Sequence, residues 1–372
     1  MLAAALLRRG VFFYLHGESM SALGVTQLVK ISQPIRMNKS KVSEYDYINF
    51  LIGTQRVYSS AEAERVSPEQ ENGPTHDAYT RQLHRLFPTT ERLWSEAQTH
   101  VDLNKGCLII DDSTLDKFYS RKIELVTRHW SGKHKRVVSG INLVTMLWTD
   151  GERHIPVDCR IYNKIKDGLT KNDHFRSMLQ VARQRGFQPE FVLFDSWYAS
   201  LENLKLIRSA GWQWLTRLEH NRHVDLNRTG NILLNQVDIP PLGRSVHLKG
   251  YGMIKVFKIV RTDADIEYWA SSDLDMSDLM RLKYAELSWM IETYHRGVKQ
   301  FCGIERCQAR SENAQRNYIE LSIRAFLRIE YHCFVKGISW FEAKTAIIRD
   351  AVRAYLTKPI YTLEPINLYA TA

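Results

Sequence analysis

The chain has 372 residues, of which 44% are hydrophobic, and its formal net charge is +10 at pH 7. This length suits two or three packed units of an ordinary globular protein rather than one minimal core. The five cysteines are odd in number and form no C-x-x-C pair, which argues against a zinc site and a disulfide framework and fits a reducing cytoplasm. The basic balance favours a polyanionic partner. The excess of Lys and Arg over Asp and Glu lies mainly between residues 101 and 222.

The N-terminal stretch "MLAAALLRRGVFFYLHG" is apolar, but Arg8 and Arg9 interrupt it early and no small-residue cleavage pattern follows. It therefore fits neither a signal peptide nor a membrane span, and we expect no membrane association. Met20 and Met37 are alternative starts to Met1. We interpret residues 1–37 as a peripheral segment or a mis-called start.

From residue 38 to residue 102, apolar residues recur at three- and four-residue spacing, broken by the polar stretch "SPEQENGPTH". This spacing predicts a small helical N-terminal domain.

Short runs rich in Val and Ile then predict strands of a buried sheet at 107–110, 137–148, 154–162 and 190–194. Helical spacing that ends at a glycine predicts helices over 170–186 and 200–211. Strands followed by helices in this order indicate an α/β fold with a mixed sheet and flanking helices, beginning with a core segment over 103–211.

The chain from 212 to 275 has a strand-and-turn pattern and predicts a β-rich insertion subdomain. A strong helical pattern covers 277–301, within a second core segment over 276–310, and residues 311–372 form a mainly helical C-terminal region.

Three acidic positions are candidates for chemistry. Asp111 and Asp112 follow the apolar run "CLII", and Asp195 follows "FVLF", so both positions are predicted at strand ends, where ligands of α/β sheets collect. Glu292 lies on the flank of the apolar stripe of the predicted helix, together with basic side chains. A single strand-end Asp is more often a turn or cap residue, and a lone helix Glu is more often solvated, so only the combination is informative.

Carboxylates from two strand ends and one helix can hold two Mg²⁺ or Mn²⁺ ions, which prefer oxygen ligands. Such ions activate a nucleophile and stabilise the leaving oxygen in phosphoryl transfer. The sequence therefore predicts a catalytic metal site formed by Asp195, Glu292 and one or both members of the pair Asp111 and Asp112.

The stretches "LIIDDST", "VLFDSWY" and "W-x-I-E…H-R-G-x-K-Q", with a β-rich insertion before the last, occur in the order and spacing of a known family. Over residues 105–310 the chain resembles bacterial insertion-sequence DDE transposases of the insertion-sequence-four type, which have an RNase H-like core. The family signature reads Tyr, two residues, Arg, three residues, Glu, six residues, Lys. Glu292 and Lys299 match it, whereas Ser288 and Ala285 stand at the Arg and Tyr positions, with Tyr284 one place away.

The family pattern of an Asp two places before a Ser or Thr points to Asp111 as the ligand of the pair. Strand alternation alone does not decide between the two, and Asp112 would then cap the turn or support the ligand.

A basic and aromatic stretch from 117 to 136 follows the first acidic position and predicts phosphate contacts. A solvated hairpin is the alternative interpretation. The candidate DNA-binding residues of the stretch 117–136 are Lys117, Arg121, Lys122, Arg128, Lys133, Lys135 and Arg136.

Further candidates lie beside the other acidic positions. Trp197 and Tyr198 follow Asp195 and could stack on an unpaired base, although core packing is equally compatible. His295, Arg296 and Lys299 lie one helical turn from Glu292, and the resemblance implies that Lys299 contacts DNA.

The resemblance implies metal-dependent cleavage at transposon ends, followed by attack of the 3′-OH ends on target DNA, in the cytoplasm of a bacterium at the nucleoid. The implied partners are double-stranded DNA, as terminal inverted repeats and target, and a second copy in a synaptic homodimer. By the same analogy, the helices of 38–102 would recognise the transposon end. Two alternatives remain: a degenerate or domesticated DNA-binding protein that does not cleave, and a metal-dependent nuclease unrelated to mobile elements.

Overall fold

The computed structural model describes residues 40–68, 73–131, 135–227, 230–262 and 265–359. The predictions for residues 1–37 and for Lys133 lie outside the described residues. The described chain from Ser40 onward belongs to one compact unit. The boundaries expected at 102, 211, 275 and 310 stay predictions.

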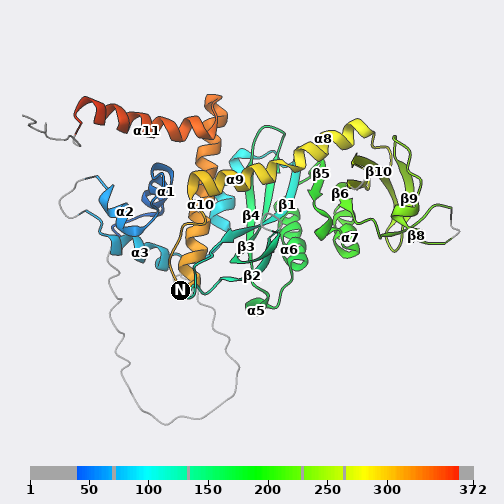
Figure 1. The fold of residues 1–372 in the computed structure, drawn as a ribbon, viewed down its shortest axis with the longest axis horizontal. Helices are drawn as coiled ribbons and strands as arrows, with labels where there is room; N and C mark the ends of the chain where they lie inside the picture. Colours follow the sequence, from blue (N-terminus) through cyan, green and yellow to red (C-terminus); the bar gives the residue numbers. More distant parts are fainter. Residues whose placement is uncertain (1–39, 69–72, 132–134, 228–229, 263–264, 360–372) are drawn as a thin grey trace, which may run out of the picture. The chain divides into compact units, whose positions relative to one another are not determined.

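The N-terminal part is helical, as its spacing predicted, and it packs on the long helix α10 (Figure 1). Ser43 caps α1 and exchanges hydrogen bonds with Asp46, a capping box that fixes where this helix begins. Ion pairs join Arg324 of α10 to Glu44 and Glu96. The helices are α1 (Glu44–Gly53), α2 (Ser60–Arg65), α3 (His76–Arg85), α4 (Glu91–Ala97) and α10 (Glu312–Lys336).

The centre of the unit is a mixed sheet whose first five core strands run in the order β4-β3-β1-β5-β6. Strand β3 is antiparallel to β1 and β4, whereas β1, β5 and β6 are parallel to one another. This order and these directions confirm the predicted RNase H-like α/β fold. The strands are β1 (Cys107–Asp116), β3 (Arg136–Thr149), β4 (Ile155–Tyr162), β5 (Phe191–Phe194) and β6 (Trp214–Leu218), and β2 (Thr127–Ser131) forms a hairpin with β3.

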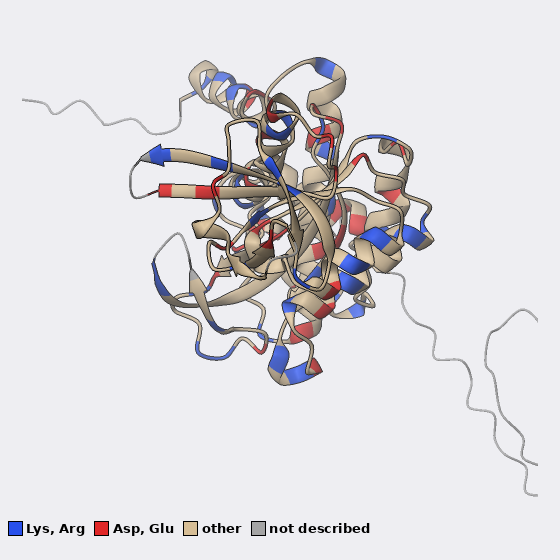
Figure 2. Cartoon of the chain, turned by 90° about the vertical axis from the view of Figure 1, so that its right-hand side faces the viewer, with Lys and Arg blue, Asp and Glu red and all other residues tan. Residues whose placement is uncertain are grey.

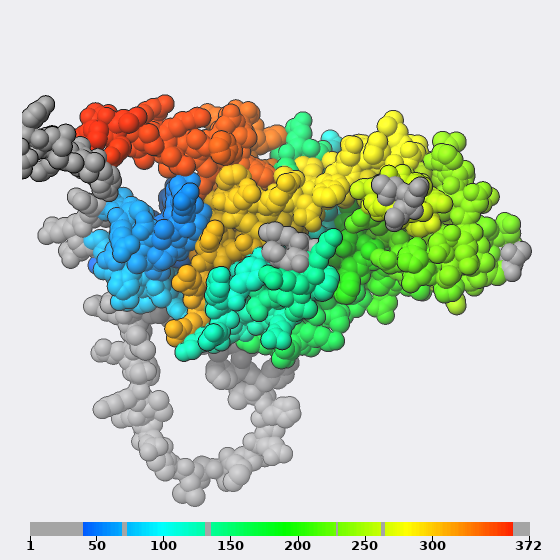
Figure 3. All heavy atoms as spheres, in the orientation of Figure 1, coloured from blue at the N-terminus to red at the C-terminus, as the bar shows by residue number. Residues whose placement is uncertain are grey.

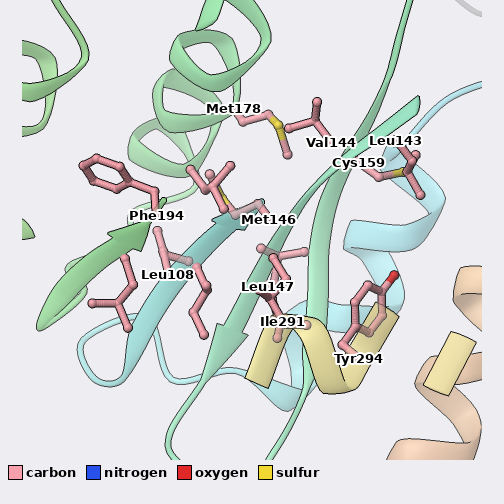
Figure 4. Close-up of a cluster of buried hydrophobic side chains, with 14 of the residues drawn as sticks. Leu108, Leu143, Val144, Met146, Leu147, Cys159, Met178, Phe194, Ile291 and Tyr294 are labelled. Carbon is pink, nitrogen blue, oxygen red and sulfur yellow. The ribbon is translucent and has the colours of Figure 1, made fainter. Parts of the chain in front are cut away.

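Two sets of helices cover the two faces of this sheet. Met146 and Leu147 are consecutive on β3 and point to opposite faces, Met146 toward Met178 of α6 and Leu147 toward Ile291 of α9 (Figure 4). We call these the α6 face and the α9 face. The helices are α6 (Lys171–Gln184), α7 (Leu201–Ser209), α8 (Asp278–Ser288) and α9 (Met290–Cys302), whereas the short helix α5 (Lys164–Asp167) is exposed along its whole length.

The β-rich segment after β6 continues the same sheet. Its strands follow in the order β11-β10-β9-β7-β8, and β11 pairs antiparallel with β6. The predicted insertion boundary at 212 falls just before β6, a strand that pairs with β5 of the core on one edge and with β11 on the other. These strands are β7 (His223–Asp225), β8 (Ile232–Leu233), β9 (Arg244–Leu248), β10 (Gly252–Thr262) and β11 (Asp265–Ser271).

The helix predicted over 277–301 is observed as α8 and α9, separated by Trp289, whose backbone angles remain helical. Both helices lie along the face of the molecule seen in Figure 3. Gly297 lets α9 pack closely, because a Cβ at this position would meet Phe326 of α10 at 2.7 Å and Trp340 of α11 (Trp340–Thr357) at 2.8 Å. Close packing against two helices fixes α9, and with it Glu292, relative to the sheet. Among the described residues, no helix combines the length and apolar character that crossing a membrane requires.

Candidate active site

The first acidic pair lies within a strand rather than at its end, which corrects the sequence interpretation. β1 continues past Asp111 and Asp112 to Asp116 because antiparallel β3 supplies hydrogen bonds along its whole length. On its other edge, parallel β5 ends at Phe194, which pairs with Ile110. The next residues on the two strands are Asp111 and Asp195, so the carboxyl end of the parallel ladder brings them together.

The α9 face holds a cavity of about 270 Å³ that all three predicted catalytic residues line. Asp111 comes from β1, Asp195 follows β5, and Glu292 lies in the first turn of α9, where it is exposed. Ile291, buried beside Glu292, anchors this turn in the core. Positions far apart in the sequence therefore converge on one cavity.

The electrostatics of this cavity disfavour carboxylate charge. Burial raises the pKa of Asp111 well above its ordinary value, and the charges of Asp112, Asp195 and Glu292 raise it further. The backbone N–H of Asp112 acts in the opposite direction but does not offset these effects. The pKa of Asp195 is also raised, first by burial and then by the charge of Asp112. A site of this kind gains stability from a bound cation.

Asp112 points to the α6 face, where donors surround its carboxylate. Oδ2 accepts hydrogen bonds from Lys171 Nζ and Asn142 Nδ2, both at 2.7 Å, and Oδ1 accepts one from Tyr198 Oη at 2.8 Å. Burial acts to raise the pKa of Asp112, but Lys171 and these hydrogen bonds outweigh it and the pKa is lowered. Asp112 is thus a neutralised carboxylate built into the structure.

Asp195 also has the local role that its position after a strand suggested. Its carboxylate accepts a hydrogen bond at 3.0 Å from the backbone N–H of Trp197 and caps the short helix Ser196–Tyr198. Within the described residues, no three His, Cys, Asp or Glu side chains are already arranged to hold a metal ion. The carboxylates share a cavity without forming a closed set of ligands.

Two arginines in the wall of the α9-face cavity were missed by sequence reasoning. Arg217 of β6 and Arg261 of β10 line it and pair with Glu267, at 3.1 and 3.4 Å. The Arg position of the family signature is Ser288, which lines the same cavity. The alternating sequence of β6 could have indicated that Arg217 points away from the buried side of the strand. It could not have indicated that the side chain faces this cavity.

Several residues of the predicted basic stretch are exposed on and near the β2-β3 hairpin. They are Arg121, Lys122, Arg128, Lys135 and Arg136. Arg128 lines a second cavity, of about 420 Å³, on the α6 face, which Asp112, Asp195 and Trp197 also line. In the view of Figure 2, basic and acidic segments alternate over many elements, so charge density alone does not distinguish these residues.

Other predicted contact residues are engaged within the protein. Lys117 is 8% exposed, and its Nζ donates to the carbonyls of Glu305 and Cys307 at 2.7 and 2.6 Å. Tyr198 is fully buried and donates to Asp112. His295 is 4% exposed, and burial lowers its pKa to about 3.

Lys299 and Arg296 differ in their surroundings. Lys299 Nζ donates to the Thr114 carbonyl of β1 at 2.8 Å and pairs with Glu305 at 2.9 Å, so it connects α9 to β1. Arg296 and Trp197 are exposed. These two retain the accessibility that DNA contact requires.

A family model described as "Transposase DDE domain" matches residues 103–327, which include all three acidic positions. The chain belongs to this family. The match begins just before β1 and ends within α10, so the DDE domain contains the whole core sheet, the β-rich segment and the helix that carries Glu292.

Among solved structures, the DDE domain protein is similar to a piggyBac transposase, determined by cryo-EM as a synaptic complex with hairpin DNA. The two chains are 13% identical, with a TM-score of 0.46, and the similarity covers 87% of this chain and 74% of that chain. The comparison with curated proteins gave no match. The family-model match confirms the predicted membership of the DDE transposases. The bacterial origin and the insertion-sequence-four subtype stay predictions.

Proposed function

We propose that this protein cleaves the ends of a mobile DNA element and joins the resulting 3′-OH ends to target DNA by metal-dependent phosphoryl transfer. The supporting observation is the convergence of Asp111, Asp195 and Glu292 on one cavity of a transposase DDE domain. Its partners would be the terminal inverted repeats, target DNA and a second copy of the chain in a synaptic homodimer. Its location would be the bacterial cytoplasm, at the nucleoid.

The donor set fits hard divalent cations. Mg²⁺ and Mn²⁺ prefer carboxylate oxygens, and the raised pKa values of Asp111 and Asp195 are the response of buried carboxyls that lack a nearby cation. Glu292 is exposed at the start of α9, which leaves its side chain room to turn toward the two aspartates. Two ions held by these residues would supply the Lewis-acid chemistry of phosphoryl transfer.

The roles of the two adjacent aspartates would differ. Asp111 would be the ligand, since it shares the cavity with Asp195 and Glu292. Asp112 would position β1 and α6, because Lys171, Asn142 and Tyr198 occupy its carboxylate. Lys299, which donates to the Thr114 carbonyl, would hold α9 and β1 at the spacing that the site needs.

Exposed cations around the cavity would meet the DNA backbone. Arg217 and Arg261 lie in the cavity wall, and Arg296 lies one turn after Glu292. The exposed residues of the hairpin region would extend this contact, namely Arg121, Lys122, Arg128, Lys135 and Arg136. Lys117, Tyr198 and His295 are left out of the proposed set because they are buried.

The test uses the full chain, Mg²⁺ and a labelled DNA fragment that carries the inverted repeats flanking the gene. We expect Mg²⁺-dependent cleavage that leaves a 3′-OH, followed by strand-transfer products. Replacing Asp111, Asp195 or Glu292 by Ala should abolish cleavage while DNA binding survives. Glu312→Ala, which removes an acidic residue at the start of α10, is the matched control and should cleave normally.

The outcomes separate the alternatives. Normal cleavage by any of the three Ala variants would overturn the assignment. Binding without cleavage by the wild-type chain would indicate a non-cleaving DNA-binding protein. Cleavage of any DNA without strand transfer would indicate a nuclease unrelated to a mobile element.

A further inference from the structure

Glu267 is a fourth carboxylate in the wall of the α9-face cavity, and the proposed cleavage chemistry gives it no role. Its side chain is 11% exposed, and donors approach both of its carboxylate oxygens. Oε1 accepts a hydrogen bond from Arg217 Nη1 at 3.1 Å, and Oε2 accepts one from Trp269 Nε1 at 3.0 Å. Arg261 Nη2 lies 3.4 Å from Oε2, so two arginines share this one carboxylate. A carboxylate occupied in this way is a poor candidate for a further metal ligand.

The sheet places these side chains together. Arg217 of β6 pairs directly with Trp269 of β11, and Glu267 is two residues from Trp269 on the same strand. Paired residues of antiparallel strands, and residues two apart on one strand, project to the same side of a sheet. Arg261 comes from β10, where the register with β11 shifts by one residue at Arg261. Arg261 is thus the additional residue of a β-bulge, a feature that redirects a side chain and often lies beside an active site.

The two arginines keep free donors in the wall of the cavity. Each guanidinium has five N–H groups, and Glu267 engages only part of each set. The side chains of Arg217 and Arg261 are 47% and 52% exposed, and neither pairs with another carboxylate in the part of the chain that the structure describes. Arginine binds a phosphate group through parallel hydrogen bonds, and a guanidinium that is already held loses less conformational entropy when it does so.

A carboxylate beside two arginines can act in either of two directions. It can hold the guanidiniums in position for a phosphate, or it can compete with the phosphate for their donors. Releasing both arginines would leave the largely buried carboxylate of Glu267 without its counterions, which is costly. We therefore expect DNA to bind the arginines while they remain paired with Glu267.

We propose that Glu267 is a positioning residue of the cleavage reaction, which holds Arg217 and Arg261 as a pair that binds the phosphate to be cleaved. This inference rests on the proposed cleavage function and adds the residue that orients the arginines. The arginine pair and the three proposed metal ligands line the same cavity, so a phosphate bound by the pair lies beside the carboxylates. Glu267 itself would touch neither DNA nor metal.

The first test is a double-mutant cycle on DNA affinity, measured with the full chain in EDTA so that cleavage does not contribute. The probe is a labelled duplex that carries the inverted repeat flanking the gene. Arg261→Ala should weaken binding about fivefold in the wild-type background, in the range of one charge-assisted contact, but less than about twofold in the Glu267→Gln background. Equal effects in the two backgrounds would overturn the proposal. A larger effect in Glu267→Gln would also overturn it, because it would show that Glu267 competes with DNA.

The matched control cycle combines Asp350→Asn with Arg353→Ala, because Asp350 and Arg353 of α11 form an ion pair at 2.8 Å outside the cavity. This cycle should show no coupling in DNA affinity. Glu267→Asp separates position from charge, since it keeps the negative charge but shortens the reach of the carboxylate. It should behave like Glu267→Gln, and a wild-type effect of Arg261→Ala in the Glu267→Asp background would overturn the positioning role.

The second test is single-turnover cleavage in Mg²⁺ over a range of protein concentrations, which separates the maximal rate from the half-saturating concentration. Glu267→Gln should lower the maximal rate by about tenfold or more. Its half-saturating concentration should stay within about threefold of wild type, because the removed negative charge offsets the weaker contact. An unchanged maximal rate would overturn the proposal. Absence of cleavage by the wild-type chain would instead refute the cleavage function, and the binding cycle would still test Glu267, so the two failures are distinguishable.

Discussion

On the α9 face of β1, Asp111 shares a cavity with Asp195 and Glu292. On the α6 face, the carboxylate of the next residue, Asp112, accepts hydrogen bonds from Lys171, Asn142 and Tyr198. Two adjacent aspartates thus have opposite pKa shifts: the pKa of Asp111 is raised and that of Asp112 is lowered. Because side chains alternate along a strand, consecutive residues face opposite sides of the sheet. The charge of Asp112 is neutralised by side chains of the protein, whereas that of Asp111 has no such partner and would be neutralised by a bound cation.

The largest expected effect is on catalysis. Asp111→Asn should reduce the cleavage rate by about a thousandfold or more, because it removes a proposed metal ligand. Asp112→Asn, measured on the folded fraction of the variant, should reduce the rate by less than about tenfold. Single-turnover cleavage in Mg²⁺ measures both rates. The reverse order of the two variants would assign the ligand role to Asp112.

Stability should respond in the opposite order. Asp112→Ala removes the ion-pair partner of Lys171, which is already half-buried. It should therefore lower the free energy of unfolding by about 3 kcal/mol. Urea unfolding followed by tryptophan fluorescence measures this change. The double variant Asp112→Ala with Lys171→Met should be less destabilised than Asp112→Ala alone, and additive effects would contradict the proposed coupling.

The pH dependence should distinguish the two aspartates further. A raised folded-state pKa gives stability that is present below the unfolded-state value and is lost as pH rises through the folded value, so ionised Asp111 destabilises the metal-free protein at neutral pH. Asp111→Asn should therefore raise the free energy of unfolding at pH 7 by about 1 kcal/mol, and this gain should vanish in acid.

Mg²⁺ provides the complementary measurement. Mg²⁺ should raise the melting temperature of the wild-type chain more than that of Asp111→Asn, since the carboxylate that Mg²⁺ neutralises is absent from the variant.

For Asp112, whose pKa is lowered, the pH dependence of stability has the opposite sign. The stabilisation by Asp112 is present above its unfolded-state pKa and is lost as pH falls through the folded-state pKa. An Asp111→Asn variant less stable than wild type at pH 7 would contradict this account.

The smallest expected effects concern DNA contacts on the two faces. Arg261→Ala, in the α9-face cavity, and Arg128→Ala, in the α6-face cavity, should each weaken DNA binding a few-fold and reduce the slope of log affinity against log salt by about one. Arg353→Ala on α11, whose side chain is 74% exposed, is the control. An unchanged slope for one variant would place the DNA backbone away from that cavity.

The elements of the fold were predictable because periodicity reports burial. The helix pattern over 170–186 and the stripe around Glu292 correspond to α6 and to α8 with α9. The extent of β1 was not predictable, because its hydrogen bonds come from β3 rather than from its own apolar residues. Strand pairing across long sequence separations leaves little trace in a local pattern.

Individual side chains in the site were harder to predict than elements. The convergence of three carboxylates followed from their positions, but the burial of Lys117 and His295 depends on which neighbours cover them. Arg217 and Arg261 were invisible because they enter the cavity from strands whose register is set only in the folded sheet. Accessibility is a property of the assembled structure, not of residue type.

Strand β6 has a mechanical consequence. Thr216 pairs with Phe194 of β5 on one edge and with Ala270 of β11 on the other, so the sheet connects the β-rich segment to the strand that directly precedes Asp195. A hinge between the two parts would have to break that ladder. The β-rich segment and the core are therefore expected to move as one rigid body. If Arg261 contacts DNA as proposed, a displacement of the β-rich segment would also shift Asp195, because both are connected through the same sheet.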